Sequence, residues 1–345
     1  MDRLLQLMRS PGARRAAAWA LRATGPAVLA FLLIRVVDYG ELGDLLGDLR
    51  YGWIIAAIGA VQLIILLRTL RWMELHKTFG LKQASFGYQL RLSYATGFAT
   101  LVLPQIVSPL SRLVLLLQDG YRTGRSVAAS VLEKLLDFAS YLAFGVVGAI
   151  ALASTFGGLV WWAIGLSLAA VLGVVVLDAV RDRLGEFARA VVQRLPGAAG
   201  ESAEGGDTAQ EIMSVNQAVA VRLLLWSLAI SMTQATMVFF ITRSVGVGLS
   251  YPFMVAVWGI IALSLLLPLS VNGVGTREAV LVTAFNAVDE STDAAVAIGL
   301  LTLAVVAIGS SPGLIEWLRR FVTGSGRDGD AIPSVAPEGE QGSAS

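Results

Sequence analysis

Five charged residues lie in stretches that are otherwise apolar enough to cross a membrane. Arg277 and Glu278 follow a broken apolar segment, Arg112 follows an earlier one, and Glu133 and Asp137 lie in a third stretch. A charge at the centre of a bilayer costs about 2.5–3.5 kcal/mol on insertion scales, so such residues often serve function. Guanidinium groups bind phosphate and carboxylate oxygens, and carboxylates balance them. These residues therefore predict a buried site for an anionic group.

The two arginines also have structural interpretations. Arg277 would instead hold a loop through backbone carbonyls, and Arg112 would extend its charge to the membrane surface. Because adjacent residues of a helix do not face each other, we expect Arg277 and Glu278 to have different partners. In that arrangement Arg277 binds the anion, and Glu278 fixes local structure or balances a second arginine.

Glu133 and Asp137 are four residues apart, which places them on one face of a helix. If the helix begins near Ser126, Asp137 lies about 16 Å along it, roughly the midplane of a 30 Å hydrocarbon core. A carboxylate at that depth needs a partner, and we expect Arg277 or Arg112 to supply it. The alternatives are that Asp137 carries a coupling proton, or that it joins two helices through an ion pair. Basic residues nearer the span ends are expected to extend to the surface: Arg68, Arg71, Lys134, Arg222 and Arg243.

Two interrupted apolar regions must position the arginines. Residues 252–288 contain LPLSVNGVGTREAV, and residues 92–118 are broken around Pro104 and Pro109. Proline removes a backbone donor and glycine weakens a helix, so neither region is expected to form a continuous helix. Non-helical backbone occurs at membrane depth where it is buried in protein or lines a cavity. We therefore expect two re-entrant pairs of half-helices, the alternative being short full spans. The loop residues assigned to the site are Pro104, Pro268, Asn272, Gly273 and Gly275.

The composition agrees with an all-α polytopic membrane protein. Of 345 residues, 56% are hydrophobic and only 15% are charged, and the mean hydropathy is +0.71. The absence of cysteine excludes disulfides and thiolate chemistry. No pattern typical of a nucleophile with its base, of a phosphate-binding loop or of a metal site is present, so we expect a protein that is not an enzyme and needs no cofactor or metal. The six expected spans are 24–39, 52–70, 127–152, 159–177, 218–242 and 294–314.

Lysine and arginine gather in alternate loops, which the positive-inside rule places in the cytoplasm together with both termini. Each half then has three crossings and one re-entrant pair, so the second half must be inverted relative to the first, as in many secondary transporters. The expected parts are a basic N-terminus (1–23), a first repeat (24–153), a second repeat (154–318) with a cytoplasmic loop (178–217), and a disordered cytoplasmic tail (319–345).

The stretch that begins at Leu267 resembles the signature Leu-Pro-(small)-x-Gly-Gly-x-Gly-x-Arg-Glu of the lysylphosphatidylglycerol synthase transmembrane-region family. The resemblance covers about residues 24–318. It extends to the first half through Tyr94, Gly97, Pro104 and Arg112, and through Glu133, Lys134 and Asp137, which resemble a Glu-Arg-x-x-x-Asp helix. Two residues depart from the pattern, Asn272 at a usual glycine and Lys134 at a usual arginine.

This resemblance implies a membrane region associated with moving lipid between leaflets, here without the soluble synthase domain. We therefore expect a flippase-like transporter of an anionic phospholipid or polyprenyl-phosphate lipid in a bacterial-type plasma membrane. The alternatives are an accessory subunit that partners a lipid- or glycan-synthesis enzyme, and a transporter of a small organic anion. No nucleic-acid partner is expected, and the sequence leaves the oligomeric state open.

Overall fold

The computed structural model describes residues 40, 47–81, 84–101, 108–119, 121, 123–152, 215–265 and 273–323. Within these ranges all regular secondary structure is helical, as the sequence predicted. The expected spans 24–39 and 159–177 lie outside the described residues, and so does nearly all of the loop 178–217. Residues 319–323, expected in the disordered tail, complete a helix instead.

Four helices are long and apolar enough to cross a membrane, and each matches an expected span. They are α4 (Tyr51–Thr78), α7 (Thr123–Ala151), α12 (Gln217–Ser244) and α15 (Thr292–Ser310). The last ends four residues before the predicted boundary, because Pro312 cannot continue it and begins α16 (Pro312–Thr323) instead. This chain is therefore a multi-pass membrane protein.

Each interrupted region consists of two helices, as expected. The first contains α5 (Phe86–Ala99) and α6 (Ser108–Gln118), and the second contains α13 (Tyr251–Leu265) and α14 (Thr276–Asn286). With 11 to 15 residues each, they are about 16–23 Å long, short of the roughly 30 Å core. Pro109 lies in the first turn of α6 rather than in the break, a position where its missing N–H costs little.

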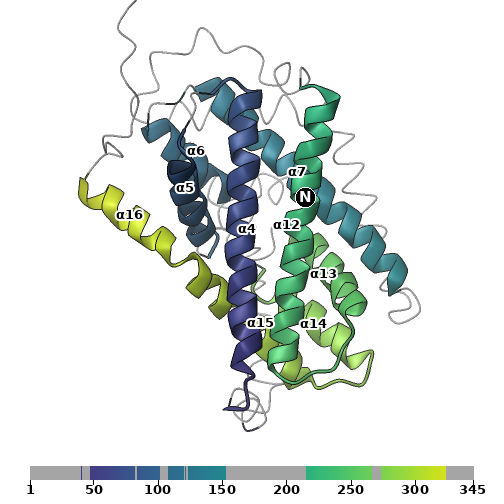
Figure 1. Ribbon diagram of the computed structural model, residues 1–345. Coiled ribbons are helices and arrows are strands. Elements are labelled where there is room, and N and C mark those ends of the chain that lie inside the picture. Colours follow the sequence, from purple (N-terminus) through teal and green to yellow (C-terminus); the bar gives the residue numbers. More distant parts are fainter. Residues whose placement is uncertain are drawn as a thin grey trace, which may run out of the picture.

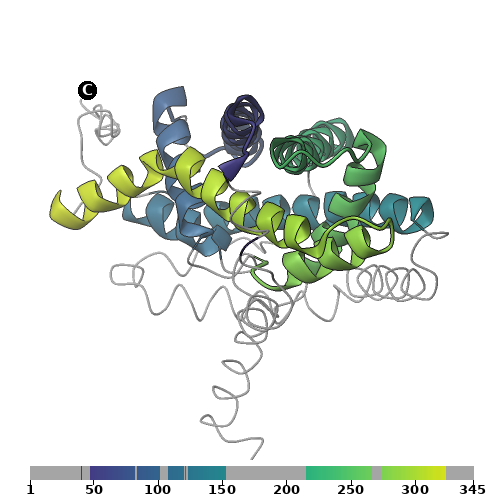
Figure 2. The same cartoon turned by 90° about the horizontal axis from the view of Figure 1, so that it is seen from below.

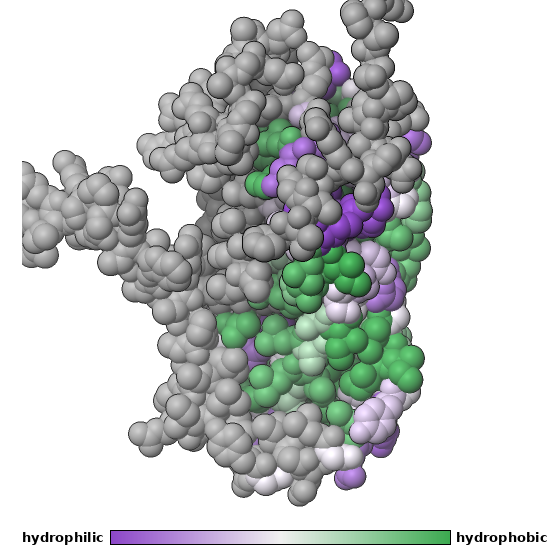
Figure 3. Space-filling view, turned by 90° about the vertical axis from the view of Figure 1, so that its left-hand side faces the viewer, coloured by the Kyte–Doolittle hydropathy of each residue, from purple (hydrophilic) through white to green (hydrophobic). Residues whose placement is uncertain are grey.

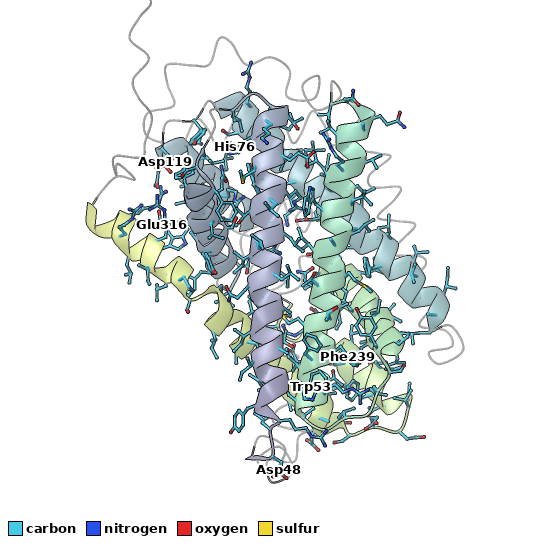
Figure 4. All side chains as sticks on the ribbon, viewed as in Figure 1. Asp48, Trp53, His76, Asp119, Phe239 and Glu316 are labelled. Carbon is cyan, nitrogen blue, oxygen red and sulfur yellow. The ribbon has the colours of Figure 1, made fainter. Side chains whose placement is uncertain are left out.

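Helices α4 and α12 lie side by side and run in opposite directions (Figures 1 and 4). At one end Trp53 of α4 contacts Phe239 and Phe240 of α12. At the other end Glu74 of α4 pairs with Arg222 of α12 at 2.9 Å. In Figure 1, α5 and α6 lie beside the upper half of this pair, and α13 and α14 lie beside the lower half.

The helix order repeats along the chain. Helices α4, α5, α6 and α7 have 28, 14, 11 and 29 residues, and α12, α13 and α14 have 28, 15 and 11 before the pair α15 and α16. The first short helix of each half packs on a helix of the other half. Helix α13 packs on α7, and α5 packs on α16. Figure 2 shows α16 leading away from α15 toward the side where α5 and α6 lie.

Glycines allow close contact where these helices cross. A Cβ atom at Gly148 of α7 would lie 2.4 Å from the carbonyl oxygen of Ala256 in α13, and one at Gly259 would lie 2.2 Å from that of Phe144. A Cβ atom at Gly313 of α16 would lie 2.1 Å from the carbonyl oxygen of Tyr94 in α5. Small residues at helix crossings are typical of membrane proteins, where van der Waals packing drives association.

Apolar side chains also remain on the outside of the bundle. Large exposed apolar residues occur on α4, α7, α12 and α16, for example Ile55, Ile150, Leu225 and Ile315. Figure 3 shows apolar surface over much of the described part of one side, with hydrophilic residues gathered above it. An apolar exterior over long helices fits contact with lipid.

Candidate functional site

The turn before α14 is built from glycines and one carboxylate. Gly273 and Gly275 have φ of 74° and 85°, in the left-handed region that favours glycine. The Gly275 N–H donates to Glu278 Oε2 at 2.5 Å, which ties the turn to the first turn of α14. The structure thus gives Glu278 the expected role of fixing local structure. Pro104, Pro268 and Asn272 lie outside the described residues.

Arg277 and Glu278 pair with each other, so the expectation of separate partners is wrong. Both are buried, and Arg277 Nη2 lies 2.6 Å from Glu278 Oε1, to which Nε also donates at 3.1 Å. Arg277 Nη2 further donates to the carbonyl of Gly299 in α15 at 2.9 Å. The two side chains converge because Gly299 leaves room: a Cβ there would lie 2.6 Å from Glu278 Cγ. This geometry favours the structural interpretation of Arg277.

Arg112 is buried but has a different environment. Its Nη2 donates to Ser93 Oγ at 2.6 Å, its Nε donates to Thr96 Oγ1 at 3.4 Å, and its Cζ lies 4.5 Å from the centroid of the Trp72 ring. The Arg112 residue is only 2% exposed, so it does not extend to the surface. Its Nη1 is buried without a hydrogen-bond acceptor, and no carboxylate of the described residues forms an ion pair with it.

The carboxylates of α7 pair with Arg71, not with Arg277 or Arg112 as expected. Arg71 Nη2 lies 2.7 Å from Glu133 Oε1, and Nη1 lies 2.6 Å from Asp137 Oδ1. Nη1 also donates to Ser227 Oγ of α12 at 2.7 Å. Arg71 is 0% exposed, so the expectation that it extends to the surface is also wrong. These contacts join α4, α7 and α12, as the ion-pair alternative for Asp137 predicted.

Lys134 is likewise not directed only at the membrane surface. Its Nζ lies 3.6 Å from Asp137 Oδ2, and its side chain is 15% exposed. The charged side chains that interact in this half, here called the first-half cluster, are Arg68, Arg71, Arg112, Glu133, Lys134 and Asp137.

A second polar assembly joins α16 to the end of α6. Asp119 accepts from Arg320 Nη1 at 3.0 Å and from Nη2 at 2.8 Å, and it also accepts from the Tyr88 hydroxyl. Glu316 accepts from Arg320 Nε at 2.7 Å. Figure 4 labels Glu316 on α16 and Asp119 near it, just after the end of α6. We call these four residues the α16 clasp.

Charge in the clasp alters the acidity of its members. Burial alone would raise the pKa of Glu316, but the hydrogen bond and positive charge of Arg320 outweigh it and hold that pKa below its usual value. Burial and the bond to Asp119 raise the pKa of the Tyr88 hydroxyl. Glu316 is therefore held as a carboxylate, and Tyr88 is held as a neutral donor.

Sequence reasoning missed three features of the site. The first is Arg71, the cation that pairs with the two carboxylates on α7. Two buried carboxylates on one helix face require a cation, and this requirement could have indicated a buried arginine on a neighbouring helix. Ser93 and Thr96 are three residues apart on α5 and share a face, which is a weak signal for a common polar partner. Gly299 carried no signal, because its role depends on how α15 packs against α14. Among the described residues no three His, Asp or Glu side chains gather as a metal site would require.

Comparison with known families identifies the chain. The family model for the lysylphosphatidylglycerol synthase TM region matches residues 17–310, which is most of the chain. A search of curated proteins gave no significant match. The match includes every predicted site residue and both interrupted regions. The chain therefore belongs to the lysylphosphatidylglycerol synthase transmembrane-region family, as the motif around Arg277 indicated.

Proposed function

We propose that this protein is a lipid transporter, not an enzyme, and that it moves a lipid with an anionic head between the leaflets of the membrane. The observation that carries the proposal is Arg112, a buried guanidinium with an unused donor inside a bundle of apolar helices. A buried donor without an acceptor is costly, so it favours a ligand that supplies one. Membership of a membrane family in lipid metabolism supports a lipid as that ligand.

The proposed architecture is an inverted repeat with two re-entrant helix pairs. The repeated helix order and lengths support it, as do the exchanged contacts of α13 with α7 and of α5 with α16. The antiparallel course of α4 and α12 is what inversion of one half relative to the other requires. The short lengths of α5, α6, α13 and α14 support re-entrant pairs over full spans.

The α16 clasp is the proposed gate of this transporter. It connects Asp119 of the first half to Arg320 of the second. Its Tyr88 lies on α5, the helix that also carries Ser93 and Thr96. Rocking of the halves toward that side would separate Asp119 from Arg320.

At the other crossing, between α7 and α13, the contact is apolar and closely packed around Gly148 and Gly259. The apolar α7–α13 contact would stay closed and serve as the pivot of the motion. The Asp119–Arg320 ion pair would break when the gate opens and form again when it closes.

The test is transport in reconstituted vesicles. Purified protein is placed in liposomes with fluorescent phosphatidylglycerol, cardiolipin or polyprenyl phosphate, and the fraction of probe accessible to an external quencher is followed with time. We expect faster exchange of at least one lipid than in empty vesicles, and a loss of about tenfold or more in Arg112→Gln. Arg222→Gln is the matched control, because the Arg222 side chain is 62% exposed and pairs with Glu74 instead of with the groups around Arg112.

The contrary outcomes point to the other functions considered. No exchange of any probe above empty vesicles would contradict transport of these lipids. Uptake of a small organic anion instead would identify a soluble substrate. Activity that appears only when a lipid- or glycan-synthesis enzyme is present would identify an accessory subunit.

A further inference from the structure

We infer that the phosphate of the transported lipid binds on one side of the molecule only, at Arg112 within the first-half cluster, and that Arg277 does not bind it. The inference rests on the proposed function, since it assigns the headgroup site of that transporter. Arg112 and Arg277 hold corresponding places after the two interrupted regions, and their surroundings decide between them.

Two of the three guanidinium nitrogens of Arg277 are already held by protein acceptors. Its Nε and Nη2 both bond to the Glu278 carboxylate, and Nη2 also bonds to the Gly299 carbonyl. Its charge is cancelled by the adjacent Glu278, which is 0% exposed. A phosphate that bound these two nitrogens would have to displace a carboxylate that also holds the Gly275 N–H. Such an exchange would leave Glu278 buried and unpaired, which is strongly unfavourable.

Arg112 has the opposite arrangement. Its neighbours are the neutral hydroxyls of Ser93 and Thr96, and its Nη1 has no acceptor. The indole of Trp72 lies against the guanidinium, a contact that fixes its orientation, and Trp72 Nε1 is also buried without an acceptor. Arg112 and Trp72 contact each other, and each has a buried nitrogen donor without an acceptor. An oxyanion with several acceptor oxygens is able to satisfy both.

The charge of the first-half cluster gives the class of ligand. Its four cationic side chains face two carboxylates, which leaves an excess of two positive charges among the described residues. Glu133 and Asp137 pair with Arg71, and Asp137 also pairs with Lys134, so the excess is carried by Arg68 and Arg112. A phosphate with one or two negative charges would balance it. A choline headgroup would instead bring a cation into this field, so phosphatidylcholine should bind weakly.

The test separates binding from transport. The purified protein in detergent is titrated with dihexanoyl phosphatidylglycerol, dihexanoyl phosphatidylcholine or inorganic phosphate, and the thermal unfolding midpoint is recorded. A ligand that binds the folded state raises the midpoint as its concentration rises. We expect phosphatidylglycerol to raise it more than phosphatidylcholine, and Arg112→Gln to weaken that response about tenfold to a hundredfold in concentration.

Three further variants keep the result interpretable. Arg112→Lys retains the charge and should bind with intermediate strength, Ser93→Ala removes one anchor of the guanidinium with little threat to folding, and Arg222→Gln should behave as wild type. Unchanged phosphatidylglycerol binding by folded Arg112→Gln would overturn the inference, whereas lipid exchange by the wild-type protein in vesicles would still support the transport function. Normal phosphatidylglycerol binding by the wild-type protein without lipid exchange in vesicles would support the binding site and contradict the transport function. A response to inorganic phosphate with none to phosphatidylglycerol would support the phosphate site and overturn the lipid as its source.

Discussion

Arg112 and Arg277 hold equivalent places in two halves of similar construction, yet their surroundings differ. Each lies on an 11-residue helix, α6 or α14, that follows a break in an apolar region. Arg277 meets a carboxylate at 2.6 Å, whereas Arg112 meets hydroxyls and an indole ring. Repetition of backbone architecture therefore does not imply repetition of charge balance. One neutralised arginine and one unbalanced arginine predict one strong anion site instead of two.

The comparison also separates a structural role from a binding role. Glu278 binds Arg277 and the Gly275 N–H together, so it holds the turn, the helix and α15 in one assembly. Removing part of such an assembly should damage the fold. Removing Arg112 should damage binding instead. The following predictions test this difference, beginning with the largest expected effect on stability.

Replacing Arg277 should cost the most stability. In Arg277→Gln the Glu278 carboxylate stays buried without its cation, so we expect the free energy of unfolding to fall by about 3–5 kcal/mol. The measurement is thermal unfolding in detergent, with the yield of monodisperse protein as a second readout. The double variant with Glu278→Gln should regain part of the loss. If Arg277→Gln were as stable as the wild type, Arg277 would not have the structural role assigned to it.

The α16 clasp offers a third arginine, Arg320, whose partner lies in the other half of the chain. Asp119→Asn removes the carboxylate that accepts two bonds from Arg320, so we expect a loss of about 1.5–3 kcal/mol. Arg320 keeps its bond to Glu316, which makes the loss smaller than for Arg277→Gln. The measurement is the same unfolding assay, with vesicle exchange to detect an altered gate. A loss as large as that of Arg277→Gln would show that the clasp contributes as much to stability as the Arg277 and Glu278 pair.

The clasp also has a defined dependence on pH. Because the pKa of Glu316 is held below its ordinary value, its contribution is fully present above the unfolded carboxyl pKa of about 4.3 and is lost as pH falls through the lower folded pKa. Unfolding midpoints measured between about pH 7 and pH 3 should fall less steeply in Glu316→Gln than in wild type. An identical pH profile would show that Glu316 is not coupled to folding.

Filling the space at Gly299 tests the assembly without removing a charge. In Gly299→Ala the new methyl group would lie 2.6 Å from Glu278 Cγ, so the Arg277 and Glu278 pair must shift. Overpacking of this kind costs about 1–3 kcal/mol. The matched control is Gly59→Ala on α4, where no atom lies within 4 Å of the added Cβ. Equal stability of the two variants would show that α15 can shift away from the Arg277 and Glu278 pair at little cost in free energy.

Arg112→Gln should have the smallest effect on stability and the largest on binding. Loss of the contact with Trp72, about 0.5–2 kcal/mol, and of the hydrogen bonds to Ser93 and Thr96 is offset by removal of an unbalanced buried charge and of a buried donor without an acceptor, about 1–3 kcal/mol for the donor. We expect unfolding midpoints close to those of wild type and a clear loss of phosphatidylglycerol binding. A loss of stability equal to that of Arg277→Gln would erase the distinction between the two arginines.

Much of the fold was predictable because its signals are local. Spans of about 20 apolar residues indicate membrane helices, and proline and glycine mark where the interrupted regions break. The left-handed conformations of Gly273 and Gly275 follow the same logic. The end of α15 was missed by four residues, because an apolar stretch continues past the turn that Pro312 requires.

Ion-pair partners were not predictable in the same way. Asp137 was expected to meet Arg112 or Arg277, but Arg71 meets it because α12 packs on both α4 and α7 and the Arg71 side chain reaches across to α7. Arg277 and Glu278 were expected to diverge, but the space at Gly299 allows both side chains to turn toward α15. Distances between side chains on different helices depend on crossing geometry, which hydropathy and spacing do not contain.

The sequence by itself determined that this is a helical membrane protein of a known family, with charged residues buried next to two broken apolar regions. Hydrophobic run length, charge placement and helix breakers suffice for that, because each acts within a few turns of chain. Only the tertiary structure decided which charges cancel. The Arg277 and Glu278 pair is closed by a glycine on α15, and Arg112 is left with an unused donor because α4 and α5 present an indole and hydroxyls instead of a carboxylate.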